Sequence, residues 1–416
     1  MIKMFYSTRE KYPASRVDLQ DLFSKRVCRQ LDIKLDWHMQ NMGELVEASQ
    51  VVDVTGETVF LGKNSMRQGV LKKVQNQYFA FLHDCKAWFY LRKNDYDIVQ
   101  VRDKFWIALI ALIAMKGRAG IFCYWMSFPY AEADLYRIQA EKDAYSFLYR
   151  VFYFIRGSLT HWLLYRVILP RADFVFVQSE RMLKDVAKQG VGHHKMMAVP
   201  MGVAWERLQN LPQAKTLGLP KEAKVAVYMG TMVKVRQLDF ILEAFVHVLA
   251  VENDAVLLMV GGEPDDVQRL QDIGTKLGIA DSVYFTGLLD MQEAWSYVLA
   301  ADICLSPFRP SPILDSTSPT KVVEYLALGK PVVVNDHPDQ SRVIEESQAG
   351  VVTQYTPESF AEGMLSLFQH PEQWSTMGKL GKKYVENTRN YDVISNRVAN
   401  VYQQLVQTVT TNRRGG

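Results

Sequence analysis

The segment DSTSPTKVVEYLALGKP, residues 315–331, carries the side chains with the clearest capacity for chemistry. Its spacing predicts a helix with Ser318 as the amino-terminal cap and Pro319 at the first helical position. Lys321 and Glu324 then lie three residues apart, on the face opposite the apolar positions. A lysine in a first helical turn opposes the helix dipole, and a bound phosphate would resolve that conflict. The alternative is a solvent-exposed ion pair between Lys321 and Glu324.

Two other turns in the same half point to a similar ligand. The apolar run 225–229 ends at Gly230, and the loop that follows carries Lys234 and Arg236. The apolar run 255–260 ends at a glycine pair, and glycine lets a ligand approach the backbone closely. Ligands of open parallel sheets bind outside the carboxyl ends of the strands. Three such ends together predict an anionic ligand that bears phosphate.

The elements that must position these turns follow from hydrophobic periodicity. Short apolar runs without alternation are typical of strands buried on both faces of a parallel sheet. In the second half, such runs alternate with helical patterns at 238–251, 267–277, 291–300 and 319–328. The pattern predicts a doubly wound α/β domain.

The first half repeats this theme less regularly. The expected strands are 1–7, 33–39, 97–101, 121–125 and 174–178, and the expected helices are 18–31 and 105–115. The stretch 55–82 is poorly patterned and receives no assignment. We therefore expect a domain over 1–205, a linker over 206–222, a second domain over 223–385, and a carboxyl-terminal helix and tail over 386–416 that return to the first domain.

Composition excludes several classes of protein. Forty-eight basic and 45 acidic residues among 416 give a net charge of +3, which does not suit a dedicated nucleic-acid-binding protein. Four scattered cysteines form no CxxC pair and indicate free thiols in a reducing compartment. The amino terminus lacks the apolar core of a signal peptide, and the longest apolar run, 105–115, is too short to span a bilayer. We expect a cytoplasmic protein.

At this point the motifs resemble those of a known family. The stretches are VYMGT (227–231), RQLDFILEAF (236–245), LMVGG (258–262), YFTGL (284–288), ADICLSP (301–307) and residues 321–334. They resemble the donor domain of retaining glycosyltransferases of the GT-B fold, sequence family 4, and in particular a polysaccharide-building subset. DFVFVQSE (173–180) and VPMGV (199–203) resemble the end of the acceptor domain. The resemblance implies two doubly wound Rossmann-like domains that face each other across a cleft.

The resemblance also implies roles for individual residues. The second glutamate of the family's paired motif falls on Glu324, which would bind the ribose hydroxyls of the nucleotide. The first glutamate falls on Ser316, so Asp315 is the candidate for the donor-sugar contact. The family's arginine after the glycine falls on Thr231, and we infer that Lys321 replaces its charge.

The family's lysine six residues after the glycine falls on Arg236. Arg236 and Lys321 are therefore expected to act in catalysis. The expected donor-binding residues are Gly230, Thr231, Gly262, Leu288, Asp315, Ser316, Pro319, Thr320 and Glu324. No cofactor is expected beyond the nucleotide-diphosphate sugar that serves as donor substrate.

The first half departs more from the family. The place of its glycine-rich loop holds YPASRVD (12–18), where Arg16 and Asp18 are candidates for sugar binding, with a solvated turn as the alternative. Arg102 and Asp103 end a predicted strand and either face the acceptor or form a local ion pair. Ser127 stands in for the family's acceptor-domain histidine.

No metal site is expected. Asp95-Tyr-Asp97 matches the DxD motif of metal-dependent glycosyltransferases, but it leads into a predicted buried strand. The adjacent His193 and His194 have no carboxylate or cysteine close in sequence and suit a solvated turn.

Residues 147–169 combine aromatic side chains with arginines at 150, 156 and 166. Such helices lie in membrane interfaces, and the alternative is a helix pair packed inside the first domain, broken at Gly157-Ser158.

These observations predict a retaining, metal-independent glycosyltransferase. It would move a sugar from a nucleotide-diphosphate sugar to a lipid-linked glycan at the cytoplasmic face of the membrane. The alternatives are a GT-B-like epimerase or phosphorylase, and a non-catalytic subunit that binds sugar nucleotides.

Overall fold

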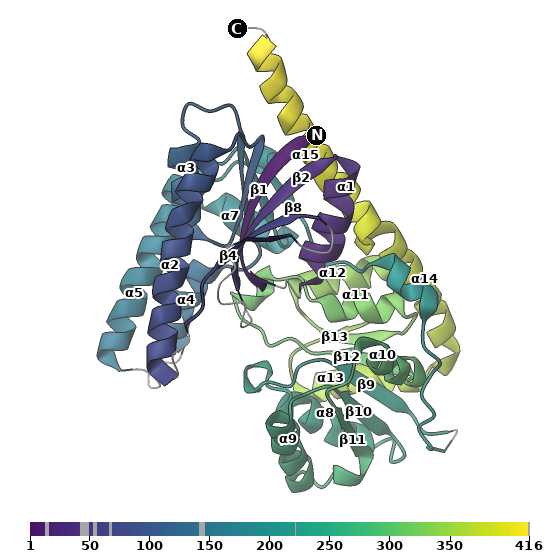
Figure 1. Ribbon diagram of the computed structural model, residues 1–416. Helices are drawn as coiled ribbons and strands as arrows, with labels where there is room; N and C mark the ends of the chain where they lie inside the picture. Colours follow the sequence, from purple (N-terminus) through teal and green to yellow (C-terminus); the bar gives the residue numbers. More distant parts are fainter. Residues whose placement is uncertain are drawn as a thin grey trace. The chain divides into compact units, whose positions relative to one another are not determined.

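The structure, a computed structural model, describes residues 1–12, 16–41, 50–52, 56–65, 69–140, 146–220 and 222–414. The chain forms two compact units. Unit 1 consists of Met1–Pro200 together with Ile394–Gly416, and unit 2 consists of Met201–Val393. Each unit is a mostly parallel sheet with helices on both faces (Figure 1). The predicted α/β class with two Rossmann-like domains is confirmed.

The sheet of unit 1 has eight strands in the order β3-β4-β2-β1-β5-β6-β7-β8. All neighbours are parallel except β3 and β4. The strands are β1 (Ile2–Tyr12), β2 (Ile33–Asn41), β3 (Gln50–Val52), β4 (Thr58–Gly62), β5 (Ile98–Arg102), β6 (Ile121–Met126), β7 (Phe174–Val177) and β8 (Met196–Ala198). The five predicted strands correspond to β1, β2, β5, β6 and β7, and the antiparallel edge strand β3 lies outside them.

Helices cover both faces of this sheet. Those on the side of α2 are α2 (Gly69–Lys93), α3 (Phe105–Ala114), α4 (Tyr130–Ala140), α5 (Phe147–Trp162) and α7 (Glu180–Lys188) (Figure 1). A π-helical segment, Leu163–Ile168, continues α5 and leads into α6 (Leu169–Arg171). The opposite side holds the π-helical segment Asp18–Val27 with α1 (Cys28–Gln30), and α15 (Tyr391–Arg414).

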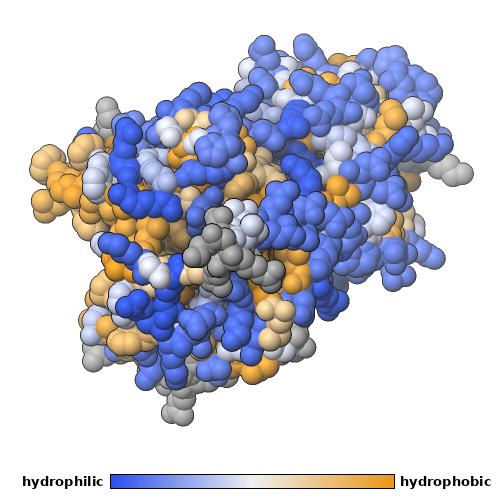
Figure 2. All heavy atoms as spheres, turned by 90° about the horizontal axis from the view of Figure 1, so that it is seen from above, coloured by the Kyte–Doolittle hydropathy of each residue, from blue (hydrophilic) through white to orange (hydrophobic). Residues whose placement is uncertain are grey.

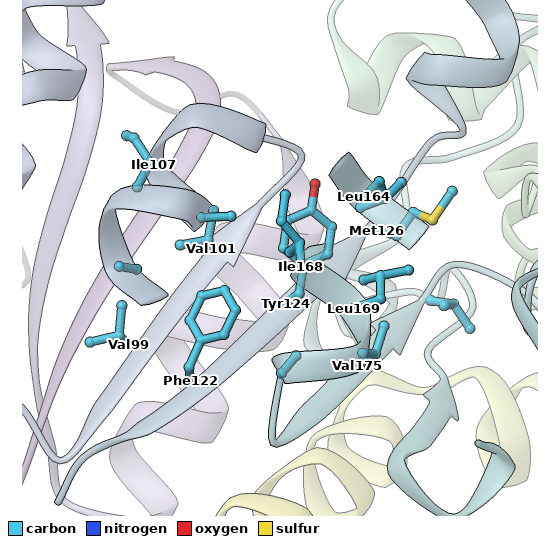
Figure 3. Packing of buried hydrophobic residues seen from close by; sticks show 14 of the residues in the cluster. Val99, Val101, Ile107, Phe122, Tyr124, Met126, Leu164, Ile168, Leu169 and Val175 are labelled. Atoms are coloured by element: carbon cyan, nitrogen blue, oxygen red, sulfur yellow. The ribbon is translucent and has the colours of Figure 1, made fainter. Parts of the chain in front are cut away.

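The two faces of the sheet have different cores. Alternate strand residues such as Val99, Val101, Phe122 and Tyr124 point toward α3 and the segment after α5, where they pack with apolar side chains (Figure 3). The other face is aromatic. Tyr6 and Trp37 on the strands, Phe23 on the first helix and Tyr402 on α15 join through ring contacts between 4.7 and 6.3 Å. Unit 1 therefore incorporates the last helix of the chain.

The sheet of unit 2 has six parallel strands in the order β11-β10-β9-β12-β13-β14. They are β9 (Val225–Met229), β10 (Val256–Val260), β11 (Val283–Gly287), β12 (Ile303–Ser306), β13 (Val332–Asn335) and β14 (Gly350–Thr353). The first strand, β9, lies in the middle, so the strand order reverses between β9 and β12. This is the arrangement of a doubly wound nucleotide-binding sheet.

The helices of unit 2 divide between the two faces of its sheet. One face packs against α8 (Asp239–Leu249), α9 (Pro264–Lys276) and α13 (Pro357–Phe368). The other packs against α10 (Met291–Ala300), α11 (Thr320–Ala327) and α12 (Pro338–Ser347), and α14 (Trp374–Tyr384) follows them in the chain. Buried strand residues on both sides explain why the sequence shows unbroken apolar runs.

The stretch 206–222, expected to be a linker, differs from that expectation. It lies within unit 2, and a 3₁₀ helix spans Trp205–Asn210. Leu208 is buried in the core beside β9, and Leu211, Leu217 and Leu219 pack against that core. The sparse, irregular leucines of this stretch therefore anchor it, which a search for helical periodicity does not detect.

The expected break at Gly157-Ser158 is wrong. α5 continues unbroken to Trp162. Gly157 is buried against α4, and a Cβ there would lie 2.9 Å from the Leu135 side chain. The glycine permits close helix packing instead of ending the helix.

Candidate active site

A pocket of about 400 Å³ lies where the strands of unit 2 end. Residues that follow β9, β10 and β11, and the first turns of α11, form its wall. This is the point at which the strand order reverses, where open parallel sheets bind ligands. Six of the residues predicted from the sequence line the pocket: Gly230, Thr231, Gly262, Leu288, Lys321 and Glu324.

Two glycines make room for side chains of the pocket wall. Gly230 has φ +143°, and a Cβ at this position would come 2.5 Å from Cε of Lys321. Gly262 has φ +91°, and a Cβ there would come 2.8 Å from the Met232 sulfur. Both backbone conformations are ones that side-chain-bearing residues rarely adopt. A larger residue at either place would strain the turn and displace a wall residue.

Lys321 faces the end of β9 instead of solvent. Its Nζ donates a hydrogen bond to Oη of Tyr228 and lies 4.0 Å from the centroid of the Tyr228 ring. Burial and the positive charge of Arg236 hold the pKa of Lys321 well below its usual range, although Glu324 acts in the opposite direction. A low pKa marks an ammonium group that lacks a full counter-charge.

Glu324 lies one turn further along α11. No nitrogen–oxygen distance of 4.0 Å or less joins it to Lys321, so the alternative of a solvated ion pair between the two is wrong. Burial raises the pKa of Glu324 to about 7, against the opposing effects of Lys321 and Arg207. The pocket wall thus holds a cation and a carboxyl group that do not neutralise each other.

Arg236 and Thr231 are joined directly. Arg236 Nε donates a hydrogen bond of 2.8 Å to Thr231 Oγ1, and the arginine is exposed at the end of the 3₁₀ helix Lys234–Arg236. Thr231 lines the pocket, whereas Arg236 does not. The charge of Arg236 still acts on the wall, because it lowers the pKa of Lys321.

The remaining predicted donor residues, Asp315, Ser316, Pro319 and Thr320, do not line the pocket. Leu314–Ser316 forms a 3₁₀ turn, in which the Asp315 amide donates to the Ser311 carbonyl at 2.8 Å.

The predicted cap of α11 is also different. Pro319 is the cap residue, and Ser318 Oγ instead donates to Asp339 at 2.6 Å, beside a buried Arg389–Asp339 ion pair of 2.7 Å. A buried charged partner outcompetes the backbone amides that a serine cap would bind.

Sequence reasoning missed two tyrosines. Tyr228 is fully buried, supports Lys321, and donates from Oη to the Thr231 carbonyl at 3.0 Å. Tyr325 Oη accepts a hydrogen bond of 2.7 Å from the Met229 amide at the end of β9. Both lie in runs that looked purely apolar. The signal that could have found Tyr228 is its position two residues before Gly230, at a strand end.

In unit 1 the five predicted acceptor residues come together at the ends of β5 and β6. Arg16 donates two hydrogen bonds to Asp18, at 3.0 and 3.1 Å. Arg102 lies 2.6 Å from Asp18, and both are nearly fully buried. Asp103 accepts hydrogen bonds from the amide and hydroxyl of Ser127. The structure brings these residues into one network, in which their charges are paired with one another.

The charges of Arg102 and Asp18 stabilise each other, whereas burial raises the pKa of Asp103 against the effects of Arg102 and Ser127. Burial acts to raise the pKa of Asp18, but Arg102 and Arg16 outweigh it and hold the pKa below its usual range. Asp103 adopts φ +56°, an uncommon conformation for a non-glycine residue. Arg16 is the member with a substantially exposed side chain, 34%.

The two aspartates of the DxD match lie elsewhere, before β5. Asp97 accepts a hydrogen bond of 2.9 Å from the Lys3 amide, and the fully exposed Asp95 lies 3.5 Å from Arg118. Neither is near the pocket of unit 2 in the chain or among its wall residues.

The chain is similar in sequence and in fold to known proteins. Residues 211–390 match the family model described as glycosyl transferases group 1. Two solved structures share the fold over nearly the whole chain. Sucrose-phosphate synthase from Thermosynechococcus elongatus has a TM-score of 0.71 and 15% identity, and covers 98% of this chain and 100% of that one. The Anabaena protein HepE in complex with UDP has a TM-score of 0.68 and 13% identity, with 97% and 100% covered. The family match and the shared fold support a glycosyltransferase of the GT-B fold.

Two curated relatives are similar in sequence. An uncharacterized glycosyltransferase of Methanocaldococcus jannaschii is 20% identical over 324 residues, which are 77% of this chain and 78% of the relative. Alpha-monoglucosyldiacylglycerol synthase of Streptococcus pneumoniae is 27% identical over 209 residues, which are 48% of this chain and 45% of the relative. The chain thus aligns with less than half of the streptococcal protein.

Proposed function

We propose that this chain is a retaining glycosyltransferase of sequence family 4 that transfers a sugar from a nucleotide-diphosphate sugar to a glycan acceptor. The observation that carries the proposal is the unpaired arrangement of Lys321 and Glu324 in the wall of a glycine-lined pocket. The Lys321 ammonium group needs an anion as its partner, and the Glu324 carboxylate needs hydrogen-bond donors. A nucleotide diphosphate offers both, because it combines ribose hydroxyls with a strongly anionic phosphate chain.

The residues that line the pocket suggest how a nucleotide diphosphate would bind. The apolar side chains of Val233, Leu288 and Met291 suit a flat base. The Glu324 carboxylate accepts hydrogen bonds from the ribose hydroxyls. These bonds are strong because the acceptor is charged. The diphosphate lies beside Gly230 and Lys321, and the absence of a Cβ at Gly230 leaves room for the lysine side chain there.

The chemistry is the stabilisation of a leaving group. As the bond between the sugar and the diphosphate breaks, negative charge develops on the phosphate oxygens. Lys321 in the pocket and Arg236 behind Thr231 offset that charge, the kind of preorganised electrostatic stabilisation that usually dominates catalysis. Binding of the diphosphate would restore the pKa of Lys321 and keep its amine protonated. Because two cationic side chains supply the charge, we propose that transfer is metal-independent.

The acceptor is proposed to be a lipid-linked glycan at the cytoplasmic face of a membrane, in polysaccharide biosynthesis. The name of the streptococcal relative, a synthase of a glucosylated diacylglycerol, supports an acceptor with a lipid part. In unit 1 we propose that Arg16 contacts the acceptor, because its guanidinium is partly exposed while Asp18, Arg102, Asp103 and Ser127 hold it in place.

A panel of nucleotide sugars, each incubated with lipid-linked and soluble glycan acceptors, tests the proposal. Transfer with retained anomeric configuration, and turnover that persists in excess chelator, is the expected result. Interconversion of free nucleotide sugars would indicate an epimerase, and phosphate-dependent cleavage of a glycan would indicate a phosphorylase. Tight nucleotide binding without turnover would indicate a non-catalytic binding subunit.

A further inference from the structure

Exposed apolar side chains of unit 1 are concentrated on three helices. Among the described residues, 25 large hydrophobic side chains are exposed, and 16 of them lie on α2, α3 and α5. Single exposed hydrophobic residues are normal on any protein surface, but contiguous groups mark interaction sites. These three helices, called the helical face below, therefore require an explanation.

The exposed residues form stripes along the helices. On α2 they are Leu71, Val74, Tyr78, Phe81, Leu82 and Phe89. On α3 they are Trp106 and Ile113, seven residues apart. On α5 the stripe of Leu148, Phe152, Ile155, Leu159 and Trp162 repeats every three or four residues. This spacing keeps each set on one side of its helix.

The three helices lie on the same side of the sheet. α2 and α3 pack together and share one core, with Ala87 and Leu91 from α2 and Ile107 from α3. The segment that continues α5 enters the same core through Leu164 and Ile168. Residues 147–169 thus contain a helix with an exposed apolar side before residue 163 and a packed segment after it. Figure 2 shows apolar atoms gathered at the left, the side on which Figure 1 draws these helices.

The helical face is also basic. Its three helices contain seven lysine and arginine residues and one acidic residue, Asp84. Asp84 is already paired with Lys104, at 2.6 Å. α5 holds Arg150 and Arg156 and no acidic residue, but Arg156 lies 2.6 Å from Asp134 of the neighbouring α4 and is paired with it. The excess charge therefore rests on Arg150 and the basic residues of α2. The face therefore combines aromatic side chains with an excess of positive charge.

We propose that the helical face docks unit 1 on the surface of an anionic lipid bilayer. Amphipathic helices with aromatic residues on one side and basic residues on the other bind the boundary between headgroups and acyl chains. Basic residues near such a surface add electrostatic attraction to anionic lipids. No described helix is long and apolar enough to cross a membrane, so docking would be peripheral.

The biological role of this docking rests on the proposed function, because a lipid-linked acceptor is reached from the bilayer surface. The docking itself is independent of transfer. It extends the membrane contact beyond 147–169 to α2 and α3, whose sequences alone give no such indication.

The test is co-sedimentation of the full chain with vesicles. Phosphatidylcholine vesicles are compared with vesicles of phosphatidylcholine and phosphatidylglycerol at about 2:1, at low salt and at about 0.5 M salt, where charges are screened. The full chain is expected to bind the anionic vesicles, to bind the neutral ones at least about tenfold more weakly, and to lose much of its binding at high salt.

Two variants separate the apolar and the charged contributions. The first is Phe152→Ser with Ile155→Ser and Trp162→Ser, three α5 residues that are 56–59% exposed. Its control replaces exposed residues of unit 2: Val251→Ser, Tyr284→Ser and Leu380→Ser. The second variant is Lys72→Glu with Lys86→Glu and Lys93→Glu on α2, all exposed. Its control is Lys276→Glu with Lys382→Glu and Lys383→Glu in unit 2.

Both helical-face variants are expected to bind anionic vesicles at least about tenfold more weakly than their controls. Affinity for a soluble nucleoside diphosphate should stay unchanged in all four, which shows that the chains are folded and separates this inference from the proposed function. Equal binding of the variants and controls would overturn the proposal, as would equal binding to neutral vesicles. Absence of vesicle binding would also overturn it. If the full chain is then a dimer that the serine variant dissociates, the face binds a second copy.

Discussion

The two sheets of this molecule reverse their strand order at equivalent places, and each carries charged side chains there. In unit 1, Arg102 at the end of β5 lies 2.6 Å from Asp18, and both are buried. In unit 2, Lys321 and Glu324 line a pocket and are not paired with each other.

The difference lies in what surrounds the charges. In unit 1, carboxylates surround Arg102, so this arginine has its counter-charge without a ligand. Unit 2 surrounds its lysine with a tyrosine ring, a glycine and a carboxyl group whose pKa is raised to about 7. A buried charge without a counter-charge destabilises the fold, and a ligand that supplies the counter-charge recovers that energy. In this molecule, incomplete pairing distinguishes a binding site from a structural network more than the presence of charge does.

The largest expected effect is on the stability of unit 1. Arg102→Ala should lower the free energy of unfolding by about 3–5 kcal/mol, because it leaves Asp18 buried without its main counter-charge. Urea denaturation measures this change. The double change Arg102→Met with Asp18→Asn is the matched control and should lose less, since it removes both charges. If the Arg102→Ala variant is fully stable but no longer transfers sugar to the acceptor, Arg102 is a binding residue and not part of a structural network.

The next effect is on turnover in unit 2. Lys321→Ala should lower turnover by about 10²–10³, the typical loss when one preorganised charge partner is removed. Its stability should stay equal or rise, because a partly buried cation without a full counter-charge is lost. Adding Thr231→Arg should restore part of the rate, and Lys276→Ala on the surface of the same unit is the control. Near-normal turnover of Lys321→Ala would remove this lysine from the site.

The smallest effect is on the pH dependence of stability. The pKa of Glu324 is raised to about 7 in the fold, so its protonated form contributes stability that is complete below its usual pKa and is lost as the pH rises through 7. Thermal unfolding between pH 5 and pH 8, in a series of buffers, should show this loss in the natural chain and a weaker pH dependence in Glu324→Gln. Parallel curves for the two chains would show that Glu324 is solvated.

Much of the fold could be predicted from the sequence because buried parallel strands are unbroken apolar runs. The run 225–229 corresponds to β9, and 238–251 contains α8. α2 escaped prediction for a physical reason. Its outer side is apolar as well as its inner side, so it lacks the contrast on which helical periodicity depends. The same exposed stripe is the basis of the proposed docking face.

The site was predictable in part. The glycines and the charged residues of the pocket could be found, because strand ends and turn chemistry are visible in the sequence. The direction of Lys321 could not, since the apolar positions of α11 place this residue on the solvent face of an isolated helix. Tertiary contact with Tyr228, 93 residues away, turns that face into a pocket wall. Asp315 and Ser316 lie in a 3₁₀ turn and do not line the pocket, so their predicted contact with the donor sugar stays a prediction.

We propose that the pocket of unit 2 binds a nucleotide diphosphate through Glu324 and Lys321. Calorimetric titration of nucleoside diphosphates, UDP among them, into the natural chain and into Glu324→Gln tests it most directly, at a pH above 7 where the carboxylate is ionised. We predict that the affinity of the natural chain for its preferred nucleotide falls about tenfold or more in Glu324→Gln, because an amide cannot match the charge-assisted bonds to two ribose hydroxyls. Lys321→Ala should weaken binding as well, while the surface control Lys276→Ala should not. An unchanged affinity in Glu324→Gln, with the fold intact, would exclude Glu324 from the nucleotide site.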